Sequence, residues 1–272
     1  MKFEQLQPSG ELKEYVKYFW TLQSQRTGLL PKTLGPLADG CPGLLFQPKE
    51  QGTFYDQRQK DLPETFLYGQ TITRTEIFII GEFKTTGVCF HPHALKHIFS
   101  FSADELTDTC LDVNLISSSK DFRLTEKLLN AESPDKQVDT LSAYLMHQIK
   151  RNDLTTDNIT RYALTEIIQS RGQASLKELQ KKLKLSERSF ERKFNQYVGI
   201  SPKLFSNVCR FQASLKQLKN NSYTKLSDIA FDNGYSDQSH FIRSFKEFAG
   251  YTPHQFQKKQ NLVMENFQVT IG

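Results

Sequence analysis

The stretch L-S-E-R-S-F-E-R-K-F-N-Q-Y-V-G-I-S-P, from Leu185 to Pro202, decides the fold because a second version of it follows 51 residues later. The second version is S-D-Q-S-H-F-I-R-S-F-K-E-F-A-G-Y-T-P, from Ser236 to Pro253. Five residues keep this offset: Phe190, Arg192, Phe194, Gly199 and Pro202 return as Phe241, Arg243, Phe245, Gly250 and Pro253. A fixed offset shared by five residues indicates an internal duplication.

Each copy predicts a helix, a turn and a second helix. In the first copy, Ser175 and Glu178 have the spacing of a capping box, and Ser186 is a cap for the following helix. In the second copy a helix opens at Thr224, breaks at Gly234-Tyr235 and restarts at Asp237, which we expect to cap its own helix. The two expected second helices run from Glu187 to Tyr197 and from Asp237 to Ala249. A linking helix, from about Pro202 to Leu218, joins the two units.

Two helix-turn-helix units joined by a linking helix are the plan of the AraC/XylS-type transcription regulators, and residues 171–259 closely resemble that family. The residues that carry the resemblance in the first unit are Leu179, Ser186, Phe190, Phe194, Gly199 and Ser201-Pro202. Those in the second unit are Ile229-Ala230, Gly234-Tyr235, Ser236-Asp237-Gln238-Ser239, Phe241, Phe245-Lys246, Gly250 and Thr252-Pro253. Arg210 on the linking helix also fits, and we interpret it as an internal brace. The resemblance implies an all-α DNA-binding domain over residues 158–260, with double-stranded DNA and RNA polymerase as partners.

The distribution of charge favours the same segment as the DNA-binding part. Residues 171–259 hold 17 Lys and Arg against 7 Asp and Glu, a net charge of +10, whereas residues 1–170 have a net charge of −4. We therefore expect a polyanion to bind to residues 171–259. Lysines of this segment are candidates for phosphate contacts: Lys181, Lys182, Lys184, Lys193, Lys203, Lys225 and Lys246.

Eight residues of the two second helices are our candidates for base recognition. Because the phenylalanines of each helix face its core, the opposite face is left for DNA. The candidates are Glu187, Arg188, Glu191 and Arg192 in the first unit and Gln238, Ser239, Ile242 and Arg243 in the second. Arginine suits guanine, glutamine suits adenine, glutamate accepts from cytosine, and an apolar side chain can touch the thymine methyl. The alternative is that these are ordinary solvated surface residues.

The front of the chain predicts a mixed domain of strands and helices over residues 1–152, so the whole chain is α+β. Short apolar runs alternate with turn residues as far as Phe90, which indicates a small sheet or barrel. Helices are expected after Pro92 and from Asp104 to Lys150, interrupted at Ser133-Pro134. The polar run R-N-D-L-T-T-D at residues 151–157 is the expected linker, and the tail from Gln260 is left open between a loose segment and a strand.

This front domain resembles a domain of unknown ligand found ahead of AraC-type domains, with the cluster Pro36, Asp39, Gly40 and Cys41 as the most distinctive match. Three roles stay open: a site for a small-molecule effector, a dimerisation or protein-contact module that gives a homodimer, and a degenerate enzyme. The candidates for lining an effector pocket are Trp20, Asp39, Cys41, Tyr68 and Phe90.

Other chemistry is disfavoured. His91, His93 and His97 have a spacing that can chelate zinc, but no further ligand completes the set, so we expect ordinary packed or surface histidines and no metal. Cys41 follows a tight turn where a thiol can be reactive, but free cysteines are most often small buried hydrophobes. Catalytic and cofactor motifs are lacking, so we predict no enzyme and no cofactor. Cysteines without pairing spacing, a start without a signal peptide and short apolar runs predict a cytoplasmic protein away from membranes.

Overall fold

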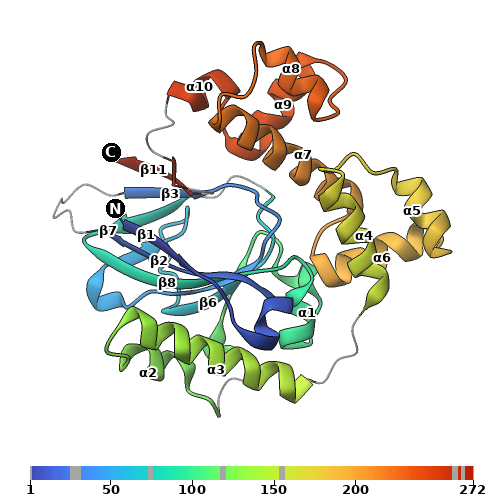
Figure 1. The fold of residues 1–272 in the computed structure, drawn as a ribbon. Coiled ribbons are helices and arrows are strands. Elements are labelled where there is room, and N and C mark those ends of the chain that lie inside the picture. The colour runs from blue at the N-terminus through green and yellow to red at the C-terminus, as the bar shows by residue number, and fades with distance from the viewer. Residues whose placement is uncertain are drawn as a thin grey trace.

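The computed structural model describes residues 2–24, 32–72, 76–116, 121–152, 157–258, 263–264 and 267–271. It confirms the α+β class: residues 2–152 form strands and helices, residues 158–258 form helices, and two further strands follow in the tail (Figure 1). No helix in these ranges is long and apolar enough to cross a membrane. Residues 153–156 of the expected linker lie outside the described residues, and the domain boundaries stay a prediction.

Two antiparallel sheets form the front domain. The six-stranded sheet has the order β1 (Lys2–Leu6), β2 (Val16–Ser24), β8 (Phe83–Phe90), β4 (Gly43–Phe46), β6 (Thr65–Tyr68) and β9 (Cys110–Asp112). The five-stranded sheet has the order β10 (Val263–Met264), β11 (Phe267–Ile271), β3 (Lys32–Pro36), β7 (Ile77–Ile80) and β5 (Thr53–Tyr55). The tail thus returns to the front domain, where β11 pairs with β3, and the strand alternative for the tail is the correct one.

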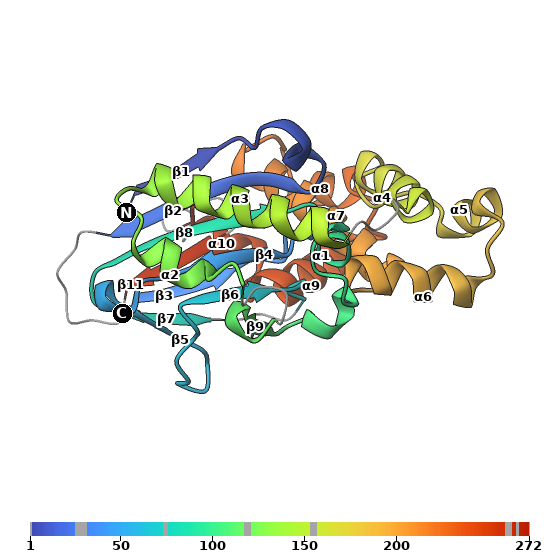
Figure 2. The same cartoon turned by 90° about the horizontal axis from the view of Figure 1, so that it is seen from below.

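Alternation along the strands assigns the two faces of the six-stranded sheet. Phe19, Leu44 and Val88 belong to a core shared with the helices, whereas their neighbours Trp20, Leu45 and Cys89 belong to a core shared with the five-stranded sheet. Successive strand residues point to opposite faces, which explains this division. The helices of the first core are α1 (Ala94–Phe99), α2 (Leu124–Leu129) and α3 (Pro134–Asn152). Figure 2 shows α2 and α3 lying across the sheet.

Several expected boundaries need correction. Strands β1 and β9 were not expected, because three to five residues give little periodicity. One of the short apolar runs expected as strands, residues 76–83, is divided between two strands: Gly81, at φ +90°, turns the chain from β7 into β8. The helix expected at Thr224 begins at Leu226 instead, since the Asp228 carboxylate accepts hydrogen bonds from the backbone N–H groups of Thr224 (3.1 Å) and Lys225 (2.7 Å).

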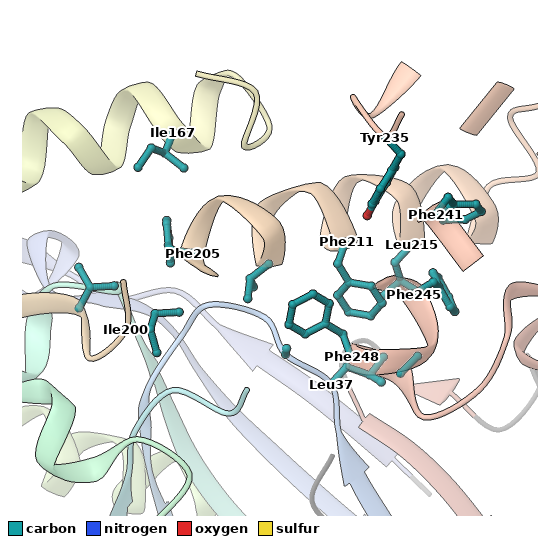
Figure 3. Packing of buried hydrophobic residues seen from close by; sticks show 14 of the residues in the cluster. Leu37, Ile167, Ile200, Phe205, Phe211, Leu215, Tyr235, Phe241, Phe245 and Phe248 are labelled. Carbon is teal, nitrogen blue, oxygen red and sulfur yellow. The ribbon is translucent and has the colours of Figure 1, made fainter. Parts of the chain in front are cut away.

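The helical domain is built around the linking helix. Its helices are α4 (Asn158–Gln169), α5 (Leu176–Leu183), α6 (Glu187–Val198), α7 (Pro202–Lys219), α8 (Leu226–Asp232), α9 (Gln238–Ala249) and α10 (Pro253–Lys258). On α7, Phe205 packs against Phe194 of α6 with ring centroids 5.7 Å apart. Phe211 on the same helix contacts Phe245 and Phe248 of α9, each at 5.3 Å (Figure 3). One continuous core therefore joins both units through α7.

The two domains are also in direct contact. Leu37 and Ala38, just after β3, are buried in the core of the helical domain. Gln212 on α7 donates a hydrogen bond from Nε2 to the Ala38 carbonyl at 2.6 Å. Arg161 on α4 forms an ion pair with Glu14. The front domain therefore constrains where the helical domain sits.

Candidate DNA-binding surface

The first part of the candidate surface is the outer face of α6. The Ser186 side chain caps this helix by accepting from the Ser189 backbone N–H, and Gly199 ends it in the left-handed conformation. Phe190 and Phe194 are buried. All four sequence-predicted residues of this helix are exposed on the other side: Glu187, Arg188, Glu191 and Arg192. The helix therefore offers two cations and two carboxylates in its first two turns.

The corresponding face of α9 is less charged. Asp237 caps it, as expected, by accepting from the His240 backbone N–H at 2.7 Å, and this bond is the largest cause of the lowered pKa of Asp237. Gln238, Ser239 and Arg243 are exposed. Ile242 is half-buried and packs against the helical core, so only part of its side chain is available to a ligand.

Basic side chains surround these two helices. Lys181, Lys182, Lys184, Lys203, Lys225 and Lys246 are exposed. Lys193 is different: its Nζ lies 3.0 Å from Oδ1 of Asp157, a carboxylate that also caps α4. Lys193 therefore holds α6 to the start of α4 in this structure. Arg210 is the internal brace that we expected, because its Nε donates to the Gly172 carbonyl at 2.9 Å.

The front domain touches α6 beside its exposed face. Thr107 donates a hydrogen bond from Oγ1 to the Gly199 carbonyl at 2.6 Å. An open depression next to this contact is lined by residues of both domains: Ser102, Asp104, Arg188, Glu191, Arg192, Asn195 and Gln196. Three of the four predicted α6 residues therefore line the same depression as Asp104, an acidic residue of the front domain. Sequence reasoning missed Asp104 and Ser102, since nothing local places them against residues more than eighty positions away.

Of the two alternatives left open for the three histidines, the structure favours packed side chains, because His97 is buried and His91 and His93 are half-buried. His97 is buried, and its ring lies 5.4 Å from that of Tyr197 on α6. Burial, followed by the neighbouring His97 and His91, lowers the pKa of His93 to about 3. Among the described residues, three side chains other than these histidines could together hold a metal ion. They are Asp39, Cys41 and Cys89, whose ligand atoms lie within 4.8 Å of one another.

The residues predicted to line an effector pocket do not all meet. Trp20, Cys41 and Tyr68 belong to the core between the two sheets, and Asp39 lies beside Cys41. Phe90 lies in the other core, against the helices. It follows Cys89 directly on β8, and neighbouring strand residues point to opposite faces of the sheet. A cavity near these residues opens between the domains and is lined by Lys17, Asp39, Gly40, Cys41, His91, Phe205, Val208 and Cys209 among others. Lys17 and Cys209, which line this cavity, were not predicted. Cys89, which lies close to Cys41, was not predicted either.

The fold and this surface define a double helix-turn-helix domain behind a mixed strand-and-helix domain. Comparison with known proteins agrees: residues 179–259 match the family described as a helix-turn-helix domain, and residues 4–112 match a domain of unknown function (DUF6597). The AraC-type pattern predicted for the back of the chain is thus confirmed, and the front of the chain matches a domain without an assigned function.

Relatives and solved structures resemble parts of this chain. An uncharacterized HTH-type transcriptional regulator of Haemophilus influenzae is 28% identical over 152 residues, which is 51% of either chain. One of Staphylococcus aureus (strain MSSA476) is 33% identical over 94 residues, 35% of this chain and 12% of that protein. The chain thus spans 51% of the first of these curated relatives and 12% of the second. ToxT from Vibrio cholerae covers 88% of this chain and 98% of its own at 13% identity, with a TM-score of 0.46. The C-terminal domain of AraT, a response regulator from Geobacillus stearothermophilus, covers 40% of this chain and 90% of its own, with 24% identity and a TM-score of 0.36.

Proposed function

We propose that this protein is a sequence-specific DNA-binding transcription regulator whose helices α6 and α9 enter two successive major grooves. One observation carries the proposal: both helices expose polar and basic side chains on one face while their opposite faces join a single core through α7. A helix of this kind fits the major groove, where each base pair presents a distinct pattern of donors and acceptors.

The length of α7 supports two adjacent grooves. Its 18 residues span about 27 Å at about 1.5 Å per residue. Successive major grooves on one face of DNA lie about 34 Å apart. The difference is small enough for a modest bend of the DNA to bring both grooves onto the two helices.

The two helices would recognise different sequences. Helix α6 offers two arginines and two glutamates, whereas α9 offers glutamine, serine, isoleucine and one arginine. Arginine at both helices favours guanine in each half-site, and glutamine adds a preference for adenine in the second. One chain would then bind an asymmetric site without needing a symmetric partner.

The front domain would control this binding through its contacts with α6 and α7. The cavity between the domains offers a place for a small-molecule effector, and the contact of Thr107 with the end of α6 offers a path for the signal. The alternative role, a dimerisation or protein-contact module without a ligand, stays open. Contact with RNA polymerase and formation of a homodimer stay predictions.

The test begins with selection of binding sequences from random DNA by the full chain. On the selected site, Arg192→Ala and Arg243→Ala should each lose about 1–3 kcal/mol of binding free energy and relax preference at separate base pairs. The matched control is Lys136→Ala, which removes one exposed positive charge from α3, away from the proposed surface. Its affinity should stay close to that of the wild type. If both arginine variants keep the wild-type preference at every base pair, the groove assignment is wrong.

A further inference from the structure

Two cysteines of the front domain are close together and play no part in DNA recognition. Cys41 lies in the turn before β4, and Cys89 lies on β8. Their Sγ atoms and a carboxylate oxygen of Asp39 all lie within 4.8 Å of one another. Both cysteines are buried, at 7% and 3% exposure, and neither is in a disulfide. Such a pair of thiols is close enough for redox chemistry.

The surroundings make the two thiols unequal. The Lys17 ammonium lies 3.6 Å from Cys41 Sγ, and the charge of Cys41 is the largest cause of the raised pKa of Lys17, which therefore stays protonated. Reactive cysteines commonly lie beside the cation of a lysine, an arginine or a histidine. A hydrogen bond to Cys41, followed by burial, raises the pKa of Cys89 well above its usual value. Cys41 is thus the thiol placed to attack an oxidant, and Cys89 is the thiol placed to form a disulfide with the oxidised Cys41.

Small molecules reach Cys41 from the cavity between the domains. Lys17, Asp39 and Cys41 all line this cavity, and Cys89 does not. Cys209 of α7 lines the cavity too, but burial raises the pKa of its thiol to about 12. Access and charge therefore select Cys41 as the first thiol to react.

We propose that Cys41 and Cys89 form an oxidisable dithiol that hydrogen peroxide converts into an intramolecular disulfide. The Cys41 thiolate attacks one peroxide oxygen, the O–O bond breaks, and hydroxide leaves and takes a proton to become water. This step gives a sulfenic acid at Cys41. The Cys89 sulfur then attacks Cys41 Sγ, the S–O bond breaks, and the second hydroxide leaves as water with the Cys89 proton. Two electrons pass from the two thiols to the peroxide.

The disulfide changes a turn that holds the linking helix. Gly40 lies so close to α7 that a Cβ added to it would meet Phe205 at 3.0 Å, and the Ala38 carbonyl accepts the bond from Gln212. An S–S bond of about 2.05 Å draws Cys41 toward β8 and away from Lys17. The turn that carries Ala38 and Gly40 then shifts against α7, so oxidation of the front domain reaches the helical domain.

A metal is the competing occupant, because an aspartate and two cysteines are also zinc ligands. Lys17 disfavours it: the ammonium already lies against Cys41 Sγ, and a second cation there would be repelled. Burial, followed by the neighbouring Cys89, raises the pKa of Tyr68 well above its usual value. Its phenol therefore stays protonated and is a poor fourth ligand. The charges thus favour thiol chemistry over metal binding.

The experiment uses the full reduced chain and hydrogen peroxide. Free thiols should fall from four to two, and mass spectrometry of unreduced peptides should find Cys41 joined to Cys89. In Cys89→Ser the reaction should stop at a sulfenic acid that dimedone traps on Cys41, and Cys41→Ser should keep its remaining thiols. Lys17→Met should slow the loss of thiols by about tenfold. Cys110→Ser and Cys209→Ser are matched controls that should still form the disulfide.

Two physical readouts complete the test. The only tryptophan of the sequence, Trp20, lies in the same core as both cysteines, so its fluorescence should change on oxidation. Hydrogen exchange over residues 202–219 should speed up in the oxidised chain, and equal exchange in both states would refute the coupling to α7. A disulfide between Cys41 and Cys209, or one equivalent of zinc in the purified chain that Cys41→Ser and Cys89→Ser both lose, would overturn the proposal. Measurements on the wild type decide even where a variant does not fold.

Discussion

Substitution of Gly172 by alanine tests how the helical domain is anchored to its linking helix. Gly172 follows α4 with φ +79°, a conformation that favours glycine. A Cβ at this position would lie 2.0 Å from the carbonyl oxygen of Ser206 in α7. Both atoms belong to or adjoin the backbone, so no side-chain rotation relieves the overlap, and the Gly172 carbonyl must move away from Arg210.

The cost follows from these contacts. A left-handed conformation costs a residue with a Cβ roughly 1–2 kcal/mol. Loss of a hydrogen bond from a charged donor, here Arg210 Nε to Gly172, costs about 1.5–3 kcal/mol. Alanine returns about 0.4–1 kcal/mol by restricting the unfolded chain. We therefore expect Gly172→Ala to lower the free energy of unfolding by about 2–4 kcal/mol.

Gly234→Ala is the matched control in the same domain. Its φ of +72° is similar, but an added Cβ would meet only the flexible Gln173 side chain, at 3.0 Å. The loss there should be about 1 kcal/mol or less. Urea unfolding followed by circular dichroism at 222 nm compares the two. Equal destabilisation of both variants would show that the close approach to Ser206 does not contribute.

Three further perturbations address the contact between the domains. Burial lowers the pKa of His93 to about 3. Between pH 3 and pH 6.5 this histidine therefore binds a proton in the unfolded chain but not in the folded chain. Stability should be full above pH 6.5 and fall by up to about 1.4 kcal/mol per pH unit below it. His93→Asn should flatten that slope in urea unfolding, and an unchanged slope would contradict the assignment. Thr107→Val removes the donor to the Gly199 carbonyl and should cost about 1–3 kcal/mol, measured as a lower melting temperature; a melting temperature equal to the wild type would show that water replaces the bond. Asp104→Asn removes a negative charge beside Arg188 and Arg192 and should strengthen DNA binding by about 0.2–1 kcal/mol at low salt, measured by fluorescence anisotropy; weaker binding would mean that Asp104 helps to position those arginines.

The helical domain could be predicted well because its signals are local and repeated. Caps such as Ser186 and Asp237 and the phenylalanine spacing of each unit lie within a few residues of the structure they determine. The front domain could be predicted only as a class. Its strands are short, and the partners of each strand depend on pairing between distant segments, such as β2 with β8.

The pocket residues show the same limit. Trp20, Cys41 and Tyr68 meet in one core, whereas Phe90 faces the other. Strand alternation could have separated Phe90 from Cys89, because neighbours on a strand point to opposite faces. No sequence pattern could have paired Cys41 with Cys89 or brought Lys17 to them, since three separate strands or turns supply these residues.

Because α7 joins both units, the distance between them depends on the number of residues in this helix, which can change only by whole residues. Each residue added to a helix lengthens it by about 1.5 Å and rotates everything beyond it by about 100°. An insertion in α7 would therefore turn α9 to a different side of the DNA before it changed the reach appreciably. If α6 and α9 enter the grooves as proposed, substitutions on their outer faces would alter the preferred bases. The spacing between the two half-sites should be inherited almost unchanged.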